Sequence, residues 1–502
     1  MTAKLVKKLT DLRLPHDWWE KTRKLTRTFH LHLGPTNSGK THTALERLKK
    51  CKKGLYCGPL RLLATEISER LNNSGVKCSL FTGQETRIVP GATHIACTVE
   101  SLNLDHEYDC ALIDEIQMID NYSRGSAWTY AVLGLHCPEI HLTGEARSRK
   151  IVESLLQQTK DNIVHYNYKR LSTLNLIPPV TRLSELMPGD CLVGFSRIKC
   201  HALKNFIEKY EPGTCSIIYG RLPPQVRVDQ AEKFNSGQHK YLISTDAIGM
   251  GLNYNINRII FVETKKNDGY SVKPLTPTEI KQIAGRAGRF NNQGFVTGTS
   301  LKKLNDICIG MHYSYPHFID RAGLSPMYEH IKEFAELYSL KNENCSYSYI
   351  LQRFKKEAKL EKLYFLQSFS EACEIADGLE GLKLPHSITH KFCTASISLH
   401  DRSQLKILRE YAELIKNDQP VNFGHFNDDL EDLELIVLEN LYNMCEIYHS
   451  LAKKFNFIYF NENEEVIRYK KELSSIIQRK LNIESEKSYG FKFNEGGLLD
   501  IF

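Results

Sequence analysis

The hydrophobic pattern of residues 28–174 alternates between short apolar runs and amphipathic stretches. The apolar runs typical of buried strands are TFHLHL (28–33), GLYCG (54–58), HIACTV (94–99), YDCALID (108–114) and EIHLTG (139–144). The stretches with helical spacing are ALERLKK (44–50), LLATEISERL (62–71) and SAWTYAVLGL (126–135). This alternation predicts a first domain, residues 28–174, with a parallel sheet and crossover helices.

A proline-rich stretch, NLIPPVTRLSELMPGD, interrupts the pattern and predicts a linker over residues 175–190. Alternation then resumes over residues 191–300. The predicted strands are CLVGF (191–195), CSIIYG (215–220), YLIST (241–245), NRIIFVE (257–263) and GFVTGTS (294–300). The predicted helices are PQVRVDQAEKF (224–234) and TPTEIKQIAGRAGRF (276–290). A second α/β domain is therefore expected.

Strand patterns become scarce beyond residue 300, and apolar residues recur at helical spacing. We therefore expect residues 301–502 to form an all-helical C-terminal domain. Residues 1–27 form a basic N-terminal extension, which we expect to be a short helix packing its Leu and Trp residues on the body. The predicted fold class is α/β, with two tandem parallel-sheet domains followed by helices.

Composition limits the partners that this chain can have. Its 66 Lys and Arg residues exceed its 59 Asp and Glu residues by seven, which permits a polyanionic partner without requiring one. No apolar run approaches the roughly 18 residues that cross a bilayer, so we expect no membrane partner. The 14 cysteines include no C-x-x-C pair, which argues against a zinc or disulfide scaffold and predicts reduced thiols.

A glycine-rich motif directly follows the first predicted strand and precedes a helix. It fits G-x-x-x-x-G-K-[ST], and its residues are Gly34, Pro35, Thr36, Asn37, Ser38, Gly39, Lys40 and Thr41. Backbone N–H groups of such a loop surround phosphates at a helix N-terminus. We expect Lys40 to reach the β- and γ-phosphates and Thr41 to hold Mg²⁺. The motif predicts a nucleotide-binding site.

A carboxylate pair completes this prediction. The buried strand over residues 110–113 ends in Asp114 and Glu115, at the edge of the sheet where the phosphate loop is expected. We expect Asp114 to meet Mg²⁺ and Glu115 to orient or deprotonate the attacking water. Solvent-exposed acidic turns are common, so this pair indicates a metal site only in combination with the phosphate loop upstream.

The second domain contains two arginines on a predicted helix, Arg286 and Arg289. Three residues apart, they share a helix face and can point into one cleft, where guanidinium groups stabilise the charge of phosphoryl transfer. A solvated basic face is the alternative. Gly285 and Gly288 argue against it, because glycine weakens a helix and needs a reason such as close backbone approach.

Two further segments of the second domain suggest contact with a nucleic acid. The loop STDAIGMG (244–251) includes Thr245 and Gly249 and can offer donors to a phosphate backbone while Gly249 touches the nucleotide cleft, although ordinary β–α loops share this composition. Asn267, Asp268 and Gly269 lie between residues able to form strands, which predicts a hairpin. We hypothesise that this hairpin separates strands at a duplex junction; a plain surface hairpin is the alternative.

In chain order, these motifs resemble those of superfamily-two helicases with two RecA-like domains. The strings are GPTNSGKT (34–41), GPLRLLA (58–64), CTVES (97–101), DEIQ (114–117), LTGE (142–145), GFSR (194–197), STDAIGMGLN (244–253) and QIAGRAGR (282–289). The DEIQ variant, GPLRLLA, YGRLPP (219–224) and FCTA (392–395) narrow the resemblance to the mitochondrial degradosome RNA helicase family, which also has bacterial members.

The resemblance implies an enzyme that uses ATP and Mg²⁺ to move 3′ to 5′ and unwind RNA, and often RNA–DNA or DNA duplexes, in RNA turnover. It implies an exoribonuclease partner and a helical region that completes a ring around the strand. The implied location is the bacterial cytoplasm, or the mitochondrial matrix in a eukaryote.

The resemblance also assigns residues. By motif match, Thr98 and Thr245 contact the nucleic acid backbone. Gln282, Arg286 and Arg289 complete the nucleotide cleft. Gln117 stands where many relatives in the wider superfamily have His, so we expect the coupling of nucleotide state to domain closure to use a neutral amide here.

Two alternatives remain open. The same pair of RecA-like domains could move along DNA, because the motifs do not distinguish RNA from DNA. A nucleic-acid-binding scaffold without catalysis is the other alternative. Intact Lys40, Glu115, Arg286 and Arg289 argue against it, because they belong to the parts that phosphoryl transfer needs.

Overall fold

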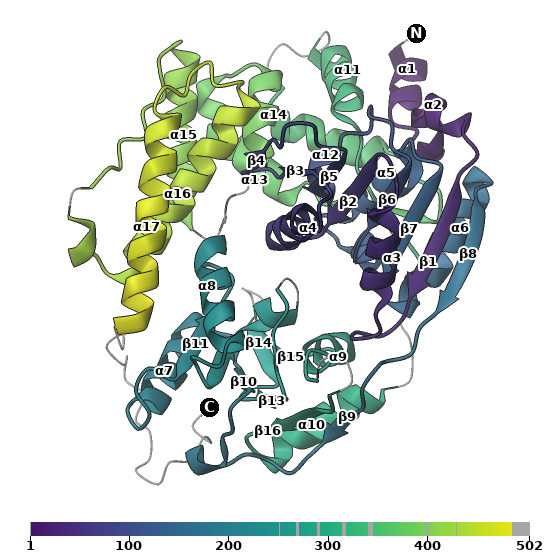
Figure 1. The fold of residues 1–502 in the computed structure, drawn as a ribbon. Coiled ribbons are helices and arrows are strands. Elements are labelled where there is room, and N and C mark those ends of the chain that lie inside the picture. The colour runs from purple at the N-terminus through teal and green to yellow at the C-terminus, as the bar shows by residue number, and fades with distance from the viewer. Residues whose placement is uncertain are drawn as a thin grey trace.

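The computed structural model describes residues 2–249, 252–267, 271–288, 292–313, 318–339, 345–395, 397, 399, 401–427 and 429–483. Two sheets lie one above the other in Figure 1, and a helical region runs alongside both. Within these residues the predicted fold class, two tandem parallel-sheet units followed by helices, is confirmed.

The first sheet has the strand order β4-β3-β5-β2-β6-β7-β1-β8, and only β3 and β4 pair antiparallel in it. Its strands are β1 (Thr28–Leu33), β2 (Gly54–Gly58), β3 (Cys78–Phe81), β4 (Thr86–Arg87), β5 (His94–Thr98), β6 (Cys110–Ile113), β7 (Glu139–Gly144) and β8 (Asn162–Asn167). Its helices are α3 (Lys40–Leu48), α4 (Arg61–Asn73), α5 (Gly125–Gly134) and α6 (Arg149–Thr159). Helices cover the faces of a parallel sheet, so β2 and β6 are buried along their whole length.

The second sheet is wholly parallel, with the order β11-β12-β10-β13-β16-β9. Its strands are β9 (Leu174–Leu176), β10 (Asp190–Val193), β11 (Cys215–Ile218), β12 (Tyr241–Ser244), β13 (Arg258–Phe261) and β16 (Gly294–Gly298). Its helices are α7 (Arg197–Glu208), α8 (Pro224–Asn235), α9 (Pro277–Ala284) and α10 (Leu301–His312).

Both boundaries of the second domain differ from those expected from the sequence. The linker expected from residue 175 begins later, because β9 (Leu174–Leu176) pairs with β16 as an edge strand of the second sheet. The helical domain expected from residue 301 also begins later. Helix α10 packs on β16 and α9, and its Ile307 lies in the apolar core of the second domain. Both differences arise from tertiary contacts, edge pairing for β9 and helix packing for α10, which leave no strong local signal.

An antiparallel hairpin of the second domain lies between the motifs at 244–253 and 282–289. It consists of β14 (Lys265–Asn267) and β15 (Val272–Pro274), with Asn267 opposite Val272, so the predicted hairpin is present. Asp268 and Gly269, at the centre of that signal, lie outside the described residues.

The C-terminal region is mainly helical. Its helices are α11 (Tyr328–Ser339), α12 (Tyr347–Glu357), α13 (Ser370–Leu379), α14 (His386–Cys393), α15 (Arg402–Lys416), α16 (Leu435–Lys454) and α17 (Asn463–Ile483). The expectation of an all-helical domain needs one correction, because β17 (Ala322–Leu324) and β18 (Tyr364–Leu366) form a small parallel sheet. These strands are three residues long, too short for a periodic pattern to predict.

The helical region contacts both sheet domains. Gly323 of β17 lies against Gly125 and Ser126 of α5, so close that a side chain there would meet the α5 backbone. At the other end α17 packs on α8 of the second domain, as Figure 1 shows for the yellow helix. The helical region therefore bridges the two domains.

The N-terminal extension packs as predicted. It contains α1 (Thr2–Leu9) and α2 (Glu20–Arg23), with Leu12 buried and Trp19 lying against Gly134 of α5. Arg27 is fully buried, where Asp161 accepts two of its hydrogen bonds and the Val132 carbonyl accepts another. A buried charge with this many partners anchors the extension to the first domain.

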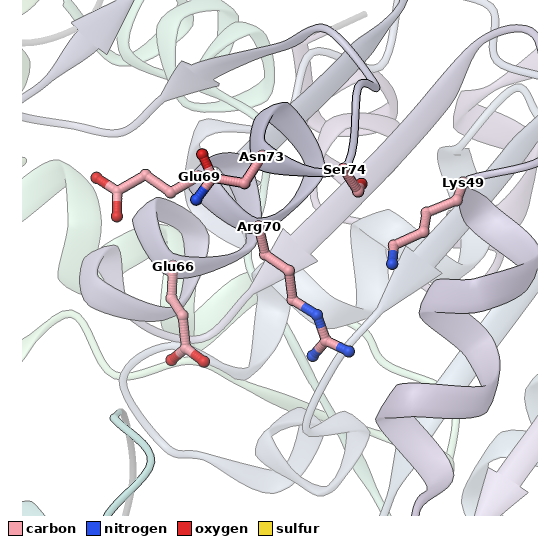
Figure 2. Close-up of a pocket in the computed structure, with 6 residues that line it drawn as sticks. All are labelled: Lys49, Glu66, Glu69, Arg70, Asn73 and Ser74. Carbon is pink, nitrogen blue, oxygen red and sulfur yellow. The ribbon is translucent and has the colours of Figure 1, made fainter. Parts of the chain in front are cut away.

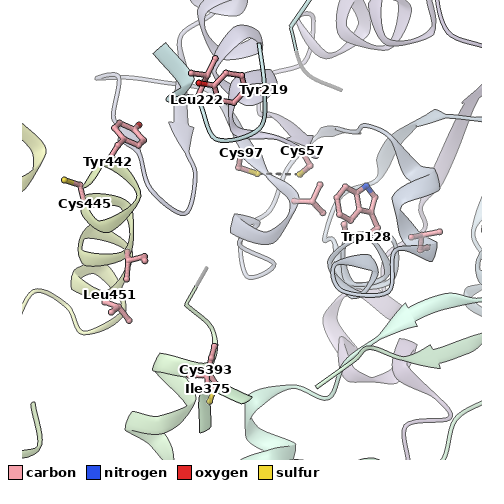
Figure 3. Packing of buried hydrophobic residues seen from close by; sticks show 14 of the residues in the cluster. Cys57, Cys97, Trp128, Tyr219, Leu222, Ile375, Cys393, Tyr442, Cys445 and Leu451 are labelled. Carbon is pink, nitrogen blue, oxygen red and sulfur yellow. Dashed lines mark hydrogen bonds between the residues drawn. The ribbon is translucent and has the colours of Figure 1, made fainter. Parts of the chain in front are cut away.

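All 14 cysteines are free thiols, and most are buried. Cys57 and Cys97 lie opposite each other on β2 and β5, with their sulfur atoms 3.6 Å apart (Figure 3). Burial raises the pKa of the Cys57 thiol well above its usual range. No helix in the described part of the chain combines the length and the apolar character needed to cross a bilayer.

Candidate nucleotide site

The phosphate loop lies between β1 and α3, as its motif predicts. Gly39 has a φ of +79° and Asn37 a φ of +53°, a left-handed backbone that curls the loop before the helix begins. Lys40 Nζ donates to the Pro35 carbonyl at 3.0 Å, across the loop. The Ser38 hydroxyl is buried without a hydrogen-bond partner among the described residues. A buried donor without a partner costs about 1–3 kcal/mol, which suits a site that a phosphate oxygen completes.

Asp114 lies at the carboxyl end of β6, directly beneath the loop. Its Oδ1 is 3.5 Å from Thr41 Oγ1, and Tyr56 and Thr143 donate hydroxyl hydrogen bonds to the carboxylate. Burial, followed by the charge of Glu115, raises the pKa of Asp114 to about 6. The structure thus brings Thr41 and Asp114 together as the sequence predicted. A divalent cation between them would compensate a carboxylate held this far from water.

Glu115 is linked to the end of β7 by Gln117. Glu115 has a φ of +52°, which turns its side chain out of the strand direction. Gln117 Nε2 donates to the Glu115 carboxylate, and Gln117 Oε1 accepts from the Glu145 backbone N–H at 3.1 Å. The buried amide therefore joins the predicted water-orienting carboxylate to the strand end that carries LTGE (142–145).

The second domain touches the phosphate loop through two glycines. A Cβ on Gly285 would overlap the Thr36 hydroxyl, so no side chain fits there. Gly288 has a φ of +70°, and its carbonyl accepts from Asn37 Nδ2 at 3.2 Å. The prediction that both glycines serve close backbone approach is confirmed.

Arg170 strengthens this junction. It lies just beyond β8, and its guanidinium donates to the carbonyls of Thr36, Gly285 and Ala287. One side chain therefore binds the loop of the first domain and the turn of the second. Burial lowers the pKa of Arg170 without neutralising it, because an arginine stays charged throughout the physiological range.

The helix expected to carry both arginines ends earlier than predicted. Helix α9 stops at Ala284, and Arg286 lies on the following turn, just beyond Gly285, which lies against Thr36 of the phosphate loop. Gln282 Nε2 and Arg286 Nε donate to the Gly249 carbonyl at 3.4 and 3.1 Å. Gln282, Arg286 and Gly249 are thus brought together. Arg289 lies outside the described residues.

Thr98 and Thr245 occupy corresponding places in the two domains. Thr98 ends β5, and its buried hydroxyl lies 2.9 Å from Ser101 Oγ. Thr245 follows β12, and its hydroxyl accepts from the Ala247 backbone N–H at 3.3 Å. Both lie at the carboxyl ends of parallel strands, the edge where α/β sheets bind ligands. Their assignment to the nucleic acid remains a prediction.

A separate hollow of about 430 Å³ lies between α3 and α4. Figure 2 shows its lining residues, which are Lys49, Glu66, Glu69, Arg70, Asn73 and Ser74. Asn253 of the second domain donates to Glu66 at 2.6 Å, so the hollow borders the domain junction. It contains none of the predicted site residues.

The sequence did not single out three contributors to the nucleotide site. Tyr56 comes from inside strand β2, where its type gave no signal. Thr143 of β7 belongs to the LTGE motif (142–145), but its hydroxyl had no predicted role. Arg170 follows β8, an exposed edge strand without a continuous apolar run. A strand prediction there would have placed Arg170 at the carboxyl edge of the sheet.

Known proteins with similar sequences identify the family of this chain. Residues 15–168 match the DEXQ-box helicase domain of Suv3, and residues 175–291 match the helicase conserved C-terminal domain. An Arabidopsis thaliana DExH-box ATP-dependent RNA helicase named DExH16, mitochondrial, is 42% identical over 410 residues, covering 80% of this chain and 71% of the relative. The chain belongs to the Suv3 helicase family. The family predicted from the motifs is confirmed, and its DEXQ box corresponds to residues 114–117.

Other relatives extend the Suv3 match along most of the chain. The mitochondrial ATP-dependent RNA helicase SUV3 of Oryza sativa subsp. japonica is 39% identical, covering 88% of this chain and 77% of the relative. The mitochondrial helicase SUPV3L1 of Gallus gallus is 36% identical, covering 94% of this chain but 62% of the relative. The chain therefore spans less than two thirds of some relatives. Among solved structures, S. cerevisiae Dbp5 bound to RNA and ADP BeF3 is 14% identical, covers 70% of this chain and 88% of that one, and has a TM-score of 0.43.

Proposed function

We propose that this Suv3-family chain is an ATP-dependent RNA helicase that moves 3′ to 5′ along one strand and unwinds duplexes. One observation carries the proposal: the phosphate loop of the first domain lies directly against the 285–288 turn of the second. A nucleotide held there would contact both domains. Its hydrolysis would therefore change how the domains bind each other, which is how a two-domain clamp moves.

The residues present fit ATP and Mg²⁺. The proposed phosphate ligands are the loop residues 34–41, with Lys40 on the β- and γ-phosphates, and Gly249 on the opposite side of the cleft. The proposed cation ligands are Thr41 and Asp114, 3.5 Å apart. Mg²⁺ bound there would neutralise phosphate charge. Glu115 would hold the attacking water, with Gln117 fixing its position, and Gln282, Arg286 and Arg289 would complete the cleft.

We propose that the nucleic acid backbone lies along the carboxyl edges of both sheets, against Thr98 and Thr245. Contacts to phosphates carry no sequence information, so the helicase would act on many sequences. The relatives' names support RNA as the strand and, in a eukaryote, the mitochondrion as the location. We further propose RNA turnover as the process, with an exoribonuclease partner. A bacterial cytoplasmic form is the alternative.

The experiment compares wild type with Lys40→Ala in RNA-stimulated ATPase and in unwinding of tailed duplexes. Matched RNA, DNA and RNA–DNA duplexes with 3′ or 5′ tails report the strand type and the direction. Lys40→Ala should lower both activities at least 100-fold, because the lysine stabilises charge that develops on the phosphates.

Lys52→Ala removes an exposed lysine 12 positions further along the chain and should leave both activities unchanged. ATPase that survives Lys40→Ala would contradict the assigned site, and wild-type protein without any ATPase would favour a binding scaffold. Unwinding confined to DNA duplexes would replace RNA with DNA as the substrate.

A further inference from the structure

Two histidines and a glutamate lie together on one face of the first sheet. His30 of β1 and His141 of β7 are direct partners in the parallel register of the two strands. Glu139 lies two residues before His141, so its side chain shares the same face. Helix α3 covers this face, and its Arg47 reaches Glu139. The cluster is therefore built by tertiary structure from two separate segments.

The donor atoms of the cluster converge. One ligand atom from each of His30, Glu139 and His141 lies within 4.8 Å of the others. His141 Nε2 is 2.9 Å from Glu139 Oε1, and the two imidazole rings stack with centroids 4.5 Å apart. Two imidazoles and one carboxylate form a ligand set that zinc uses with a water in the fourth position.

Each histidine of the cluster has an outer hydrogen-bond partner on one ring nitrogen. His30 Nδ1 lies 3.1 Å from the Tyr166 hydroxyl, and His141 Nδ1 lies 2.8 Å from His32 Nε2. The second ring nitrogen of His30, Nε2, remains for a ligand role, whereas His141 Nε2 would exchange its hydrogen bond to Glu139 for the ion. Metal-binding histidines characteristically bond their other nitrogen in this way, which fixes the ring and its tautomer.

We propose that His30, Glu139 and His141 bind one divalent transition-metal ion, with Zn²⁺ the expected occupant, at a site separate from the proposed Mg²⁺ site. Imidazole nitrogen favours zinc, cobalt, nickel or copper over magnesium. Glu139 and His30 are only partly buried, so an ion can enter from solvent. Coordination by both Nε2 atoms requires the stacked rings to rotate until their lone pairs converge.

Arg47 sets the strength of this site. Its guanidinium makes two hydrogen bonds to Glu139, at 2.7 and 2.5 Å, and occupies both carboxylate oxygens. An ion must share the carboxylate with this cation and is repelled by it. Arg47→Gln should therefore strengthen metal binding, which sets a metal site apart from a simple ion-pair network.

The test titrates the chelator-treated full chain with Co²⁺ and then with Zn²⁺. Visible absorption detects the bound Co²⁺, and equilibrium dialysis measures the affinity and the number of ions bound. Wild type should bind one Co²⁺ with visible absorption of a nitrogen- and oxygen-ligated ion, and Zn²⁺ should displace it. His30→Ala and Glu139→Gln should each weaken binding at least 10-fold, as loss of a ligand or its support does. Arg47→Gln should bind more tightly than wild type. His106→Ala, an exposed histidine on the same domain, serves as the control and should bind like wild type.

Three results would overturn the proposal. One is wild-type protein that binds no Co²⁺ at micromolar concentrations. Another is binding that His30→Ala and Glu139→Gln leave unchanged. The third is a thiolate-to-cobalt band in the near ultraviolet, which would place the ion on cysteines. Because Arg47→Gln is expected to gain affinity, a folding defect in the ligand variants cannot imitate the full pattern.

Discussion

Gly285 is the residue at which the second domain comes closest to the phosphate loop. Any side chain there would overlap the Thr36 hydroxyl, and Arg170 binds both sides of the same contact. Packed interfaces respond to an added methyl group by shifting, because their interiors are already filled. The nucleotide cleft thus depends on the absence of one side chain.

Gly285→Ala is expected to separate the turn from the loop and to lower the ATPase kcat about 10-fold or more, since misplacing catalytic groups by about 1 Å costs up to about 100-fold. Thermal unfolding should change little. Gly220→Ala, where nothing lies within 4 Å of the added carbon, is the matched control. Steady-state ATPase equal to wild type in Gly285→Ala would show that this contact does not matter for the reaction.

His201 illustrates how a single buried residue makes the second domain sensitive to acid. Burial, then Arg197 and Lys204, lowers the pKa of His201 to about 3, against about 6.5 in an unfolded chain. The unfolded state therefore binds the proton first. The stability that the neutral ring contributes is present above about pH 6.5 and is lost as the pH falls from there toward 3.

Between about pH 7.5 and pH 5.5, this one residue should lower the free energy of unfolding by about 1.4 kcal/mol. His201→Asn removes the titrating group, so its loss of stability over the same interval should be smaller by that amount. Urea unfolding at the two pH values measures the difference. Equal losses in the two proteins would mean that folding does not lower the pKa of His201.

At the scale of elements, the β14–β15 hairpin is the segment most suited to meet a duplex. Lys265 and Asn267 of β14 and all three residues of β15 are exposed, with Val272 at 65%. Lys266 pairs with Glu279 of α9, the helix that leads into the turn at the nucleotide cleft. The hairpin thus joins two exposed strands to the helix that leads into the candidate nucleotide cleft.

Shortening the hairpin by replacing residues 266–273 with a two-residue Asn-Gly turn should abolish unwinding while sparing RNA-stimulated ATPase. The physical reason is that translocation needs the cleft, whereas strand separation needs an obstacle at the junction. Parallel ATPase and tailed-duplex assays check this. Unwinding at the wild-type rate would identify a plain surface hairpin.

Over the whole molecule, α16 links the helical region to both sheet domains. Its Glu439 is fully buried and binds Arg197 of α7 at 3.0 Å, and Tyr219 also donates to it. One heptad later, Glu446 binds Arg61 of α4 at 2.6 Å. The two glutamates lie on the same face, so one helix holds an arginine from each domain.

Glu439→Ala removes the buried carboxylate that binds Arg197 and Tyr219, and it should destabilise the contact with the second domain by about 3–5 kcal/mol. Limited proteolysis and thermal unfolding should reveal earlier release of that domain. Glu410→Ala on α15, an exposed position, should stay within about 0.5 kcal/mol of wild type. Identical melting of both variants would show that α16 does not hold the second domain.

The sequence by itself determined the local features of this protein. The phosphate loop, the Asp114–Glu115 pair and the central strands were predictable, because each depends on neighbouring residues and on a continuous apolar run. The edge strands β8 and β9 were not, since an edge strand with few apolar residues is defined by its pairing partner.

Only the tertiary structure decided which distant residues meet. It brought Tyr56 and Thr143 to Asp114, and Arg170 to the turn at Gly285. It also placed α10 in the second domain and joined His30 to His141. The physical reason is that such contacts depend on how strands are ordered and helices packed, and no local pattern of hydrophobic and polar residues records that order.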